Sequence, residues 1–261
     1  MSLMNHDVWR YNSGTVTNAA GLVTQALVDA CALQPSDRVL DLACGGGNPS
    51  VYIASLVTTA GLVVAADVEM RSLVALAEIT RAGRIGNLHP SRCGSDHLPF
   101  PAGCFDAATC RFGVMFFADL PGTLAELHRV LRRGARLGFA VYGPKRSNSL
   151  YLEVEAAIAN LGVSAASCSQ RLFRFSDDRI LEDALVTAGF GCVRATDVTG
   201  TWDQTGDVQI LHLLQRTYQP AIAALGGQAG PAFVADVQRQ LVRKRNAGKL
   251  TWHFRIVSSE R

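Results

Sequence analysis

The sequence predicts an α/β protein with a Rossmann-like, seven-stranded, mostly parallel sheet, helices on both faces and helical cover insertions in the C-terminal half. Up to about residue 142, short apolar β-branched runs alternate with segments of helical apolar spacing, as in βαβ units. With 261 residues, 48% of them hydrophobic and 18% charged, the chain can bury one substantial core. Beyond residue 142 the alternation loosens, which indicates insertions over the carboxyl ends of the strands.

The first part of the chain contains the expected parallel strands. They are apolar runs at Arg38–Ala43, Leu62–Asp67, Leu88–Cys93, Phe105–Cys110 and Ala135–Tyr142. Apolar residues recur at helical spacing between them and before them, at Thr17–Ala32, Pro49–Val57, Met70–Ala82 and Leu120–Leu131. A turn at 34–37, which contains Pro35, joins the first helix to the first strand.

The second part is less regular. The spacing predicts helices at Ser147–Leu161, Asp178–Ala188, Val208–Leu225 and Pro231–Ala247, and strands at Gly191–Thr199 and Leu250–Ser258. In the last strand Trp252, Phe254 and Ile256 form an apolar face. We expect one domain over 1–261, with an N-terminal lid and helix at 1–36, a binding core at 37–142 and a C-terminal half at 143–261 that carries the cover insertions.

Composition narrows the class of protein. A net charge of +3 and the absence of a basic stripe interleaved with aromatic residues argue against nucleic-acid binding. No apolar run approaches the roughly 18 residues that span a bilayer, and residues 1–11 lack the apolar core of a signal peptide. Seven cysteines without a C-x-x-C pair read as small buried hydrophobes, so no metal site is expected. A cytoplasmic monomer or homodimer is the expectation.

A glycine-rich loop follows the first strand, in Asp41-Leu-Ala-Cys-Gly-Gly-Gly47-Asn-Pro. A P-loop requires Gly-Lys-Ser/Thr, and no lysine follows Gly47. A dinucleotide fingerprint requires a third glycine where Ser50 stands, and Asp41 would repel a pyrophosphate at the helix N-terminus. S-adenosylmethionine (SAM) carries an ammonium and a sulfonium, so a carboxylate beside the loop favours it over both nucleotides.

This loop resembles the E/D-x-G-x-G-x-G motif of class I SAM-dependent methyltransferases, in particular their UbiE/COQ5-like (methyltransferase type 11) family, with Ala43 replacing the first glycine. Three further segments resemble the same family in order. They are the acid that ends Val63-Val-Ala-Ala-Asp67, the run Gly94-Ser-Asp-His-Leu-Pro-Phe100, and the fourth-strand block 105–113. A fifth, the segment from Leu127 to Gly134, resembles the helix and turn before strand five. The resemblance covers residues 15 to 142 and fades beyond them.

The resemblance implies a set of site residues, with S-adenosyl-L-methionine as cofactor and S-adenosyl-L-homocysteine as product. Those implied for cofactor binding are Asp41, Ala43, Gly45 and Gly47 at the methionine end, Asp67 at the ribose, Val68, Met70, Ser95, Asp96 and His97 around the adenine, Arg111 near the sulfonium, and Tyr11 in a lid. Those implied for substrate binding are Phe112, Phe116, Tyr142 and Trp9. Several of these residues have a structural alternative: Met70, Phe116 and Phe117 could pack in the hydrophobic core, and Tyr11 could lie in a frayed terminus.

Methyl transfer by in-line SN2 displacement can rest on proximity and orientation, because the leaving thioether is neutral. No catalytic residue is therefore assigned. His97, His212 and His253 are candidate bases, His128 is interpreted as structural, and a solvated role is favoured for His253. The mixed content of the later helices favours a small-molecule acceptor (O-, C- or N-), with aromatic natural products, quinones and sterol-like lipids all open.

The sequence leaves several other functions to be weighed. A protein of this fold could act as a non-methylating cyclase or as a ligand-binding protein, and it could be an NAD-dependent oxidoreductase or an interaction module. The intact acidic positions and Ser50 argue against these readings in favour of a SAM-dependent methyltransferase.

Overall fold

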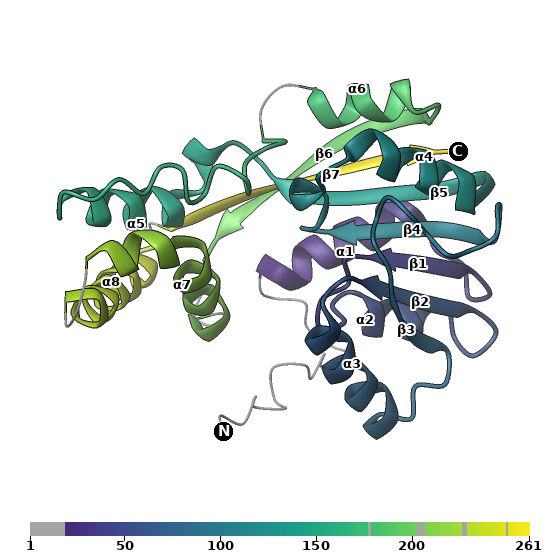
Figure 1. The fold of residues 1–261 in the computed structure, drawn as a ribbon, viewed down its shortest axis with the longest axis horizontal. Coiled ribbons are helices and arrows are strands. Elements are labelled where there is room, and N and C mark those ends of the chain that lie inside the picture. The colour runs from purple at the N-terminus through teal and green to yellow at the C-terminus, as the bar shows by residue number, and fades with distance from the viewer. Residues whose placement is uncertain (1–18, 177–178, 203–206, 226–228, 249) are drawn as a thin grey trace.

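The computed structural model describes residues 19–176, 179–202, 207–225, 229–248 and 250–261. Seven strands form one sheet in the order β3-β2-β1-β4-β5-β7-β6, in which β7 alone runs antiparallel to its neighbours (Figure 1). The expected seven-stranded, mostly parallel sheet with helices on both faces is thereby confirmed.

The elements of the first half follow the expected alternation. They are α1 (Ala19–Cys31), β1 (Arg38–Leu42), α2 (Ser50–Leu56), β2 (Leu62–Asp67), α3 (Met70–Ala82), β3 (Leu88–Arg92), β4 (Phe105–Arg111), the 3-10 turn η2 (Val114–Phe116), α4 (Leu120–Val130) and β5 (Leu131–Tyr142). β5 begins four residues earlier than expected, because the chain passes from α4 directly into an extended segment. The pairing of that segment with β4 shifts register between Phe105 and Ala107.

The second half also contains each expected element. They are the 3-10 turn η3 (Lys145–Ser147), α5 (Ser149–Ala159), α6 (Ile180–Thr187), β6 (Gly191–Thr201), α7 (Asp207–Ala224), α8 (Ala229–Asn246) and β7 (Thr251–Glu260). β6 and β7 are each two residues longer at their carboxyl ends than the sequence predicts, and they pair along most of their length. None of the helices in the described ranges is long and apolar enough to cross a membrane.

Alternate residues of the strands face opposite layers of helices, as the period of a strand requires. Val39 of β1 belongs to a buried cluster with Ile53 of α2 and Leu76 of α3. Leu40 belongs to a second cluster, with Leu124 of α4. The two clusters make a sheet that is covered on both faces, so its ligand-accessible edge is the one at the carboxyl ends of the parallel strands.

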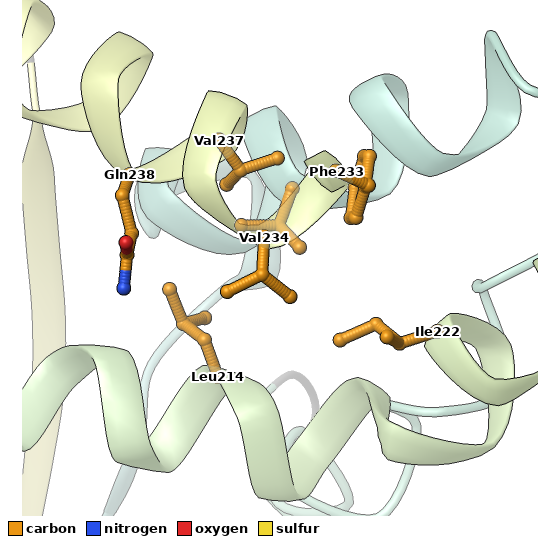
Figure 2. A pocket seen from close by; sticks show the side chains of 7 residues that line it. Leu214, Ile222, Phe233, Val234, Val237 and Gln238 are labelled. Carbon is orange, nitrogen blue, oxygen red and sulfur yellow. The ribbon is translucent and has the colours of Figure 1, made fainter. Parts of the chain in front are cut away.

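Helices α5, α7 and α8 gather beyond that edge as a separate lobe, reached from the sheet by the long strands β6 and β7 (Figure 1). We call these three helices the helical lobe. Figure 2 shows apolar side chains of α7 and α8 facing each other, among them Leu214 and Val234, around a small cavity of about 20 Å³. The lobe thus has its own apolar contacts, which explains how it holds together away from the sheet.

Candidate functional site

A cavity of about 590 Å³ opens at the carboxyl ends of β1, β2, β3 and β4. That volume lies in the usual range for small-molecule sites. Its walls come from four loops. They contribute Leu42, Ala43 and Gly45 after β1, Asp67, Val68, Glu69 and Ser72 after β2, Cys93, Gly94, Ser95 and Asp96 after β3, and Phe112, Gly113, Phe116, Phe117, Ala118 and Asp119 after β4. Four of the five segments that resemble a methyltransferase core in the sequence therefore meet at one site.

The glycine loop after β1 depends on backbone conformations that favour glycine. Gly45 and Gly47 have φ values of +52° and +97°, and Ala43 at +55° shares this left-handed region. A Cβ at Gly47 would lie 2.4 Å from Leu76 Cδ1 of α3, so only a residue without a side chain lets the loop approach this helix so closely. Gly47 is buried and does not line the cavity, whereas Gly45 does.

Asp67, which ends β2, is fixed at the cavity by two backbone donors. Gly45 N donates to Asp67 Oδ2 and Glu69 N donates to Asp67 Oδ1, both at 2.8 Å. Each carboxylate oxygen can accept a further hydrogen bond. The side chain is half-buried and lines the cavity, so it can meet a diol or a cation there.

Asp41, in the neighbouring strand, lies in a different environment. It is fully buried and accepts hydrogen bonds from Ser50 Oγ and, at 2.8 Å, from Thr109 Oγ1. Burial raises the pKa of Asp41 to about 6, although the two hydroxyl groups and the nearby Arg111 oppose the shift. Asp41 does not line the cavity, and its bond to Ser50, the first residue of α2, closes the base of the glycine loop. Ser50, which reads in the sequence as a missing glycine, is one of its partners.

The cavity wall is acidic. Asp67, Glu69, Asp96 and Asp119 line it, and among the described residues of the wall none is a lysine, arginine or histidine. Glu69 and Asp119 also cap the N-termini of α3 and α4, where they accept from Arg71 N at 3.2 Å and Gly122 N at 2.9 Å. Such a wall favours a cationic ligand and disfavours a pyrophosphate.

An aromatic wall bounds the cavity on the β4 side. Phe112, with φ +58°, and the 49% exposed Phe116 line it together with Phe117. The ring of Phe112 packs 5.2 Å from Tyr142 and 5.0 Å from Phe254, measured between centroids. Tyr142 is buried behind Phe112, and its hydroxyl accepts from Tyr151 Oη at 2.8 Å. The expected substrate-binding Tyr142 therefore supports the wall from behind in this structure.

Other predicted site residues lie apart from the cavity wall. Arg111 Nη1 donates to Ala20 O at 3.3 Å and to Thr24 Oγ1 at 3.2 Å, so the guanidinium turns towards α1. Met70 and His97 are exposed and do not line the cavity. Trp9 and Tyr11 lie outside the described residues.

Several residues that line the cavity were not among the site residues expected from the sequence. They are Leu42, Glu69, Ser72, Cys93, Gly94, Gly113, Phe117, Ala118 and Asp119. A capping signal could have revealed Asp119, because an acidic residue directly before the first residue of a helix is typical of an N-cap. Glu69 likewise precedes a helix directly.

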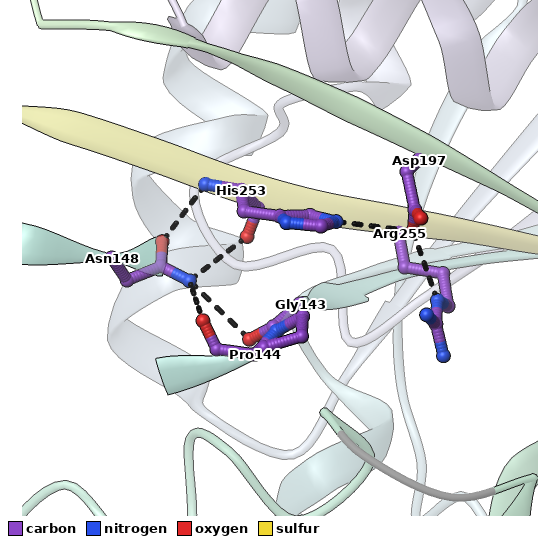
Figure 3. Close-up of polar contacts among 6 residues, drawn as sticks. All are labelled: Gly143, Pro144, Asn148, Asp197, His253 and Arg255. Carbon is purple, nitrogen blue, oxygen red and sulfur yellow. Dashed lines mark hydrogen bonds and ion pairs between the residues drawn. The ribbon is translucent and has the colours of Figure 1, made fainter. Parts of the chain in front are cut away.

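Of the histidine candidates, His97 and His253 lie outside the cavity wall. His253 has a side chain only 14% exposed, with Nε2 3.1 Å from Asp197 Oδ1, which also accepts from Arg255 Nε at 3.0 Å (Figure 3). A Cβ at Gly143 would lie 2.3 Å from the imidazole ring, which shows how closely the ring covers β5. The solvated role expected for His253 is therefore wrong. His128 packs on Phe190 with centroids 5.3 Å apart, and the side chain of His212 lies outside the described set.

Comparison with known proteins agrees with the motifs. Residues 1–141 match the ubiE/COQ5 methyltransferase family. The chain is 30% identical over 187 residues to the ubiquinone/menaquinone biosynthesis C-methyltransferase UbiE of Teredinibacter turnerae, an alignment covering 66% of this chain and 74% of that protein. It is 38% identical over 108 residues to the 2-phytyl-1,4-naphtoquinone methyltransferase of Synechococcus elongatus, covering 40% of this chain and 46% of that protein. Alignments with further UbiE proteins span only 44 or 45% of their length.

Among solved structures, the [4+2]-cyclase SpnF is similar with a TM-score of 0.59 and 19% identity, over 92% of this chain and 80% of that one. At this level of identity the similarity shows a shared fold alone. The match to the family ends at residue 141, so the helical lobe lies beyond it.

Proposed function

Since the chain belongs to the ubiE/COQ5 methyltransferase family and is thereby a SAM-dependent methyltransferase, we propose that it methylates a small aromatic molecule bound beside Phe112 and Phe116. The observation that carries the proposal is the cavity wall. At one edge of the sheet its described residues combine four acidic side chains with an aromatic side and include no basic side chain. This composition suits a cationic nucleoside next to an apolar ring.

The described residues fit SAM. In this proposal Asp67 accepts hydrogen bonds from the ribose hydroxyls, Gly45 and Ala43 allow the methionine end to approach the backbone, and Ser95 and Asp96 lie at the adenine edge. Asp41 contributes negative charge from beneath the loop. Bound SAM supplies the electrophilic methyl group, and the acidic wall holds its positive charge.

The acceptor side is aromatic. The relatives named above act on a quinone precursor or on 2-phytyl-1,4-naphtoquinone. Phe112, Phe116 and Phe117 offer faces and edges on which a flat ring can stack. We therefore infer a reduced quinone or similar ring as acceptor and one of its carbon atoms as the methylated site. The chain's residues orient the two reactants and exclude water, which can supply much of the rate enhancement.

Incubation with methyl-labelled SAM and a panel of reduced benzoquinones and naphthoquinones tests this proposal. Label in the organic extract, at a ring carbon by mass spectrometry, is expected for at least one acceptor with the wild-type protein and not with Asp67→Ala. Label only on oxygen or nitrogen acceptors would overturn the quinone assignment. Saturable SAM binding with turnover of no acceptor would favour a repurposed pocket, as in a cyclase. A cytoplasmic location and a monomeric or homodimeric state stay predictions.

A further inference from the structure

The connection after α5 lies between the cofactor cavity and the helical lobe. Within it, Leu172, Phe173 and Phe175 are buried. The ring of Phe173 lies 5.3 Å from Tyr142 and 5.2 Å from Tyr151, measured between centroids. Through Tyr142 this connection therefore packs behind Phe112 of the cavity wall.

Arg174 extends from the same connection to the cavity wall itself. Its Nη1 donates to Phe117 O at 2.8 Å, and its guanidinium lies 5.0 Å from the centroid of Phe175. Phe117 follows η2, the short turn that presents Phe116 to the cavity. Two earlier carbonyl groups of this turn accept hydrogen bonds from within it: Phe116 N donates to Gly113 O, and Phe117 N donates to Val114 O. Arg174 thus ties the carboxyl end of the turn to the connection after α5, 57 positions further along the chain.

The other end of the connection is anchored in the helical lobe. Ser169 Oγ donates to Glu155 Oε1 of α5 at 2.5 Å, and the same oxygen accepts from Tyr218 Oη of α7 at 2.9 Å. Lys145 Nζ lies 2.6 Å from Glu155 Oε2. These contacts fix Ser169 on the lobe side, and the buried Phe173 and Phe175 hold the backbone on either side of the exposed Arg174.

We propose that Arg174 is a positioning residue for the cofactor cavity: by holding Phe117 at the end of η2, it sets the place of Asp119, two residues further on, in the acidic wall that binds SAM. The inference rests on SAM as the ligand of the cavity. It places a determinant of cofactor affinity in the C-terminal half, beyond the 1–141 segment that matches the family. A guanidinium bonded to a carbonyl is a strong, directional tether, and without it the exposed turn must be ordered when the ligand binds.

Calorimetric titration with SAM tests the assignment on four proteins: wild type, Arg174→Ala, Arg174→Lys and Arg171→Ala. Arg171 is the matched control, because it is exposed and makes no side-chain hydrogen bond or ion pair within the described ranges. Arg174→Ala is expected to raise the Kd for SAM about 10-fold, Arg174→Lys to restore part of that loss, and Arg171→Ala to match wild type. Thermal midpoints without ligand should agree within about 2 °C, which a merely structural role would not allow.

Unchanged SAM affinity in Arg174→Ala would overturn the assignment, as would a loss of affinity that Arg171→Ala shares. If Arg174→Ala does not fold, Arg174→Lys and Arg174→Gln are compared instead, and equal SAM affinity in both would overturn it. Wild-type protein that binds no SAM would overturn both this inference and the proposed function. A wild-type protein that binds SAM with no effect of Arg174 would remove this inference alone.

Discussion

The cofactor core and the helical lobe both contain buried or half-buried carboxylates, but they use them differently. In the core, Asp67 is bonded to backbone N–H groups and faces a cavity, and Asp41 lies beneath the glycine loop. In the lobe, Glu155 is surrounded by Lys145, Ser169 and Tyr218, which leave little of it for a ligand. The comparison teaches that Asp67 keeps acceptor capacity open to the cavity, whereas Glu155 spends its acceptor capacity on holding α5 to α7 and to the connection after α5.

The largest expected effect is on ligand binding in the core. Asp67→Ala removes the acceptor of Gly45 N and Glu69 N and the expected partner of the ribose hydroxyls. The Kd for SAM should rise at least about 100-fold, or about 3 kcal/mol. Titration calorimetry measures it. Asp236→Ala on α8, which removes an exposed partner of Arg239, is the lobe control and should bind SAM as wild type does. Equal affinities in the two variants would break the comparison.

The second effect concerns the stability cost of a buried core carboxylate. The folded-state pKa of Asp41, about 6, lies above its ordinary value of 3.8. Its contribution to stability is therefore most favourable below about pH 4 and is lost as the pH rises through 6. Asp41→Asn should stabilise the protein by up to about 3 kcal/mol at pH 8 and by little at pH 4.5, while weakening SAM binding. Chemical denaturation at both pH values measures the difference. A stabilisation that is equal at both would contradict the account.

The third effect tests the lobe. Tyr218→Phe removes one of the donors to Glu155 and leaves Lys145 and Ser169 in place. The free energy of unfolding should fall by about 1 to 2 kcal/mol, because a half-buried carboxylate loses a hydrogen bond. Urea denaturation measures the fall, and the Kd for SAM should stay within about two-fold. A large loss of SAM affinity at unchanged stability would mean that this cluster belongs to the binding site.

The smallest effect concerns the surface of the lobe. Lys244 of α8 pairs with Glu153 of α5, and both side chains are more than a third exposed. Lys244→Ala should cost less than about 1 kcal/mol, and salt should reduce that cost, because exposed ion pairs are screened. Denaturation at low and high salt measures it. A cost above that of Tyr218→Phe would reverse the ranking of buried and exposed contacts in the lobe.

Sequence reasoning located the fold and much of the core site because the signals there are local. The positions of the strands and the bounds of the helix Met70–Ala82 follow from apolar spacing, and Asp67 from its place at the end of a strand, whereas the start of β5 and the ends of β6 and β7 do not. Where Asp41 points could not be predicted, since it depends on Thr109 from another strand.

The contacts of the second half are long-range, so the sequence could not supply them. Arg174 reaches a carbonyl 57 residues away. The pairing of His253 with Asp197 depends on how β6 and β7 align, a register in which Asp197 stands opposite Arg255. A one-residue slip would turn Asp197 to the other face of the sheet.

Parallel titration of the wild-type protein with SAM and with NADH tests the central claim, that the acidic cavity at the carboxyl ends of β1, β2, β3 and β4 is a SAM site. Saturable micromolar binding of SAM, lost in Asp67→Ala, with no heat from NADH is the predicted result. Binding of NADH, or SAM binding that Asp67→Ala leaves unchanged, would contradict the claim and assign the cavity to another ligand.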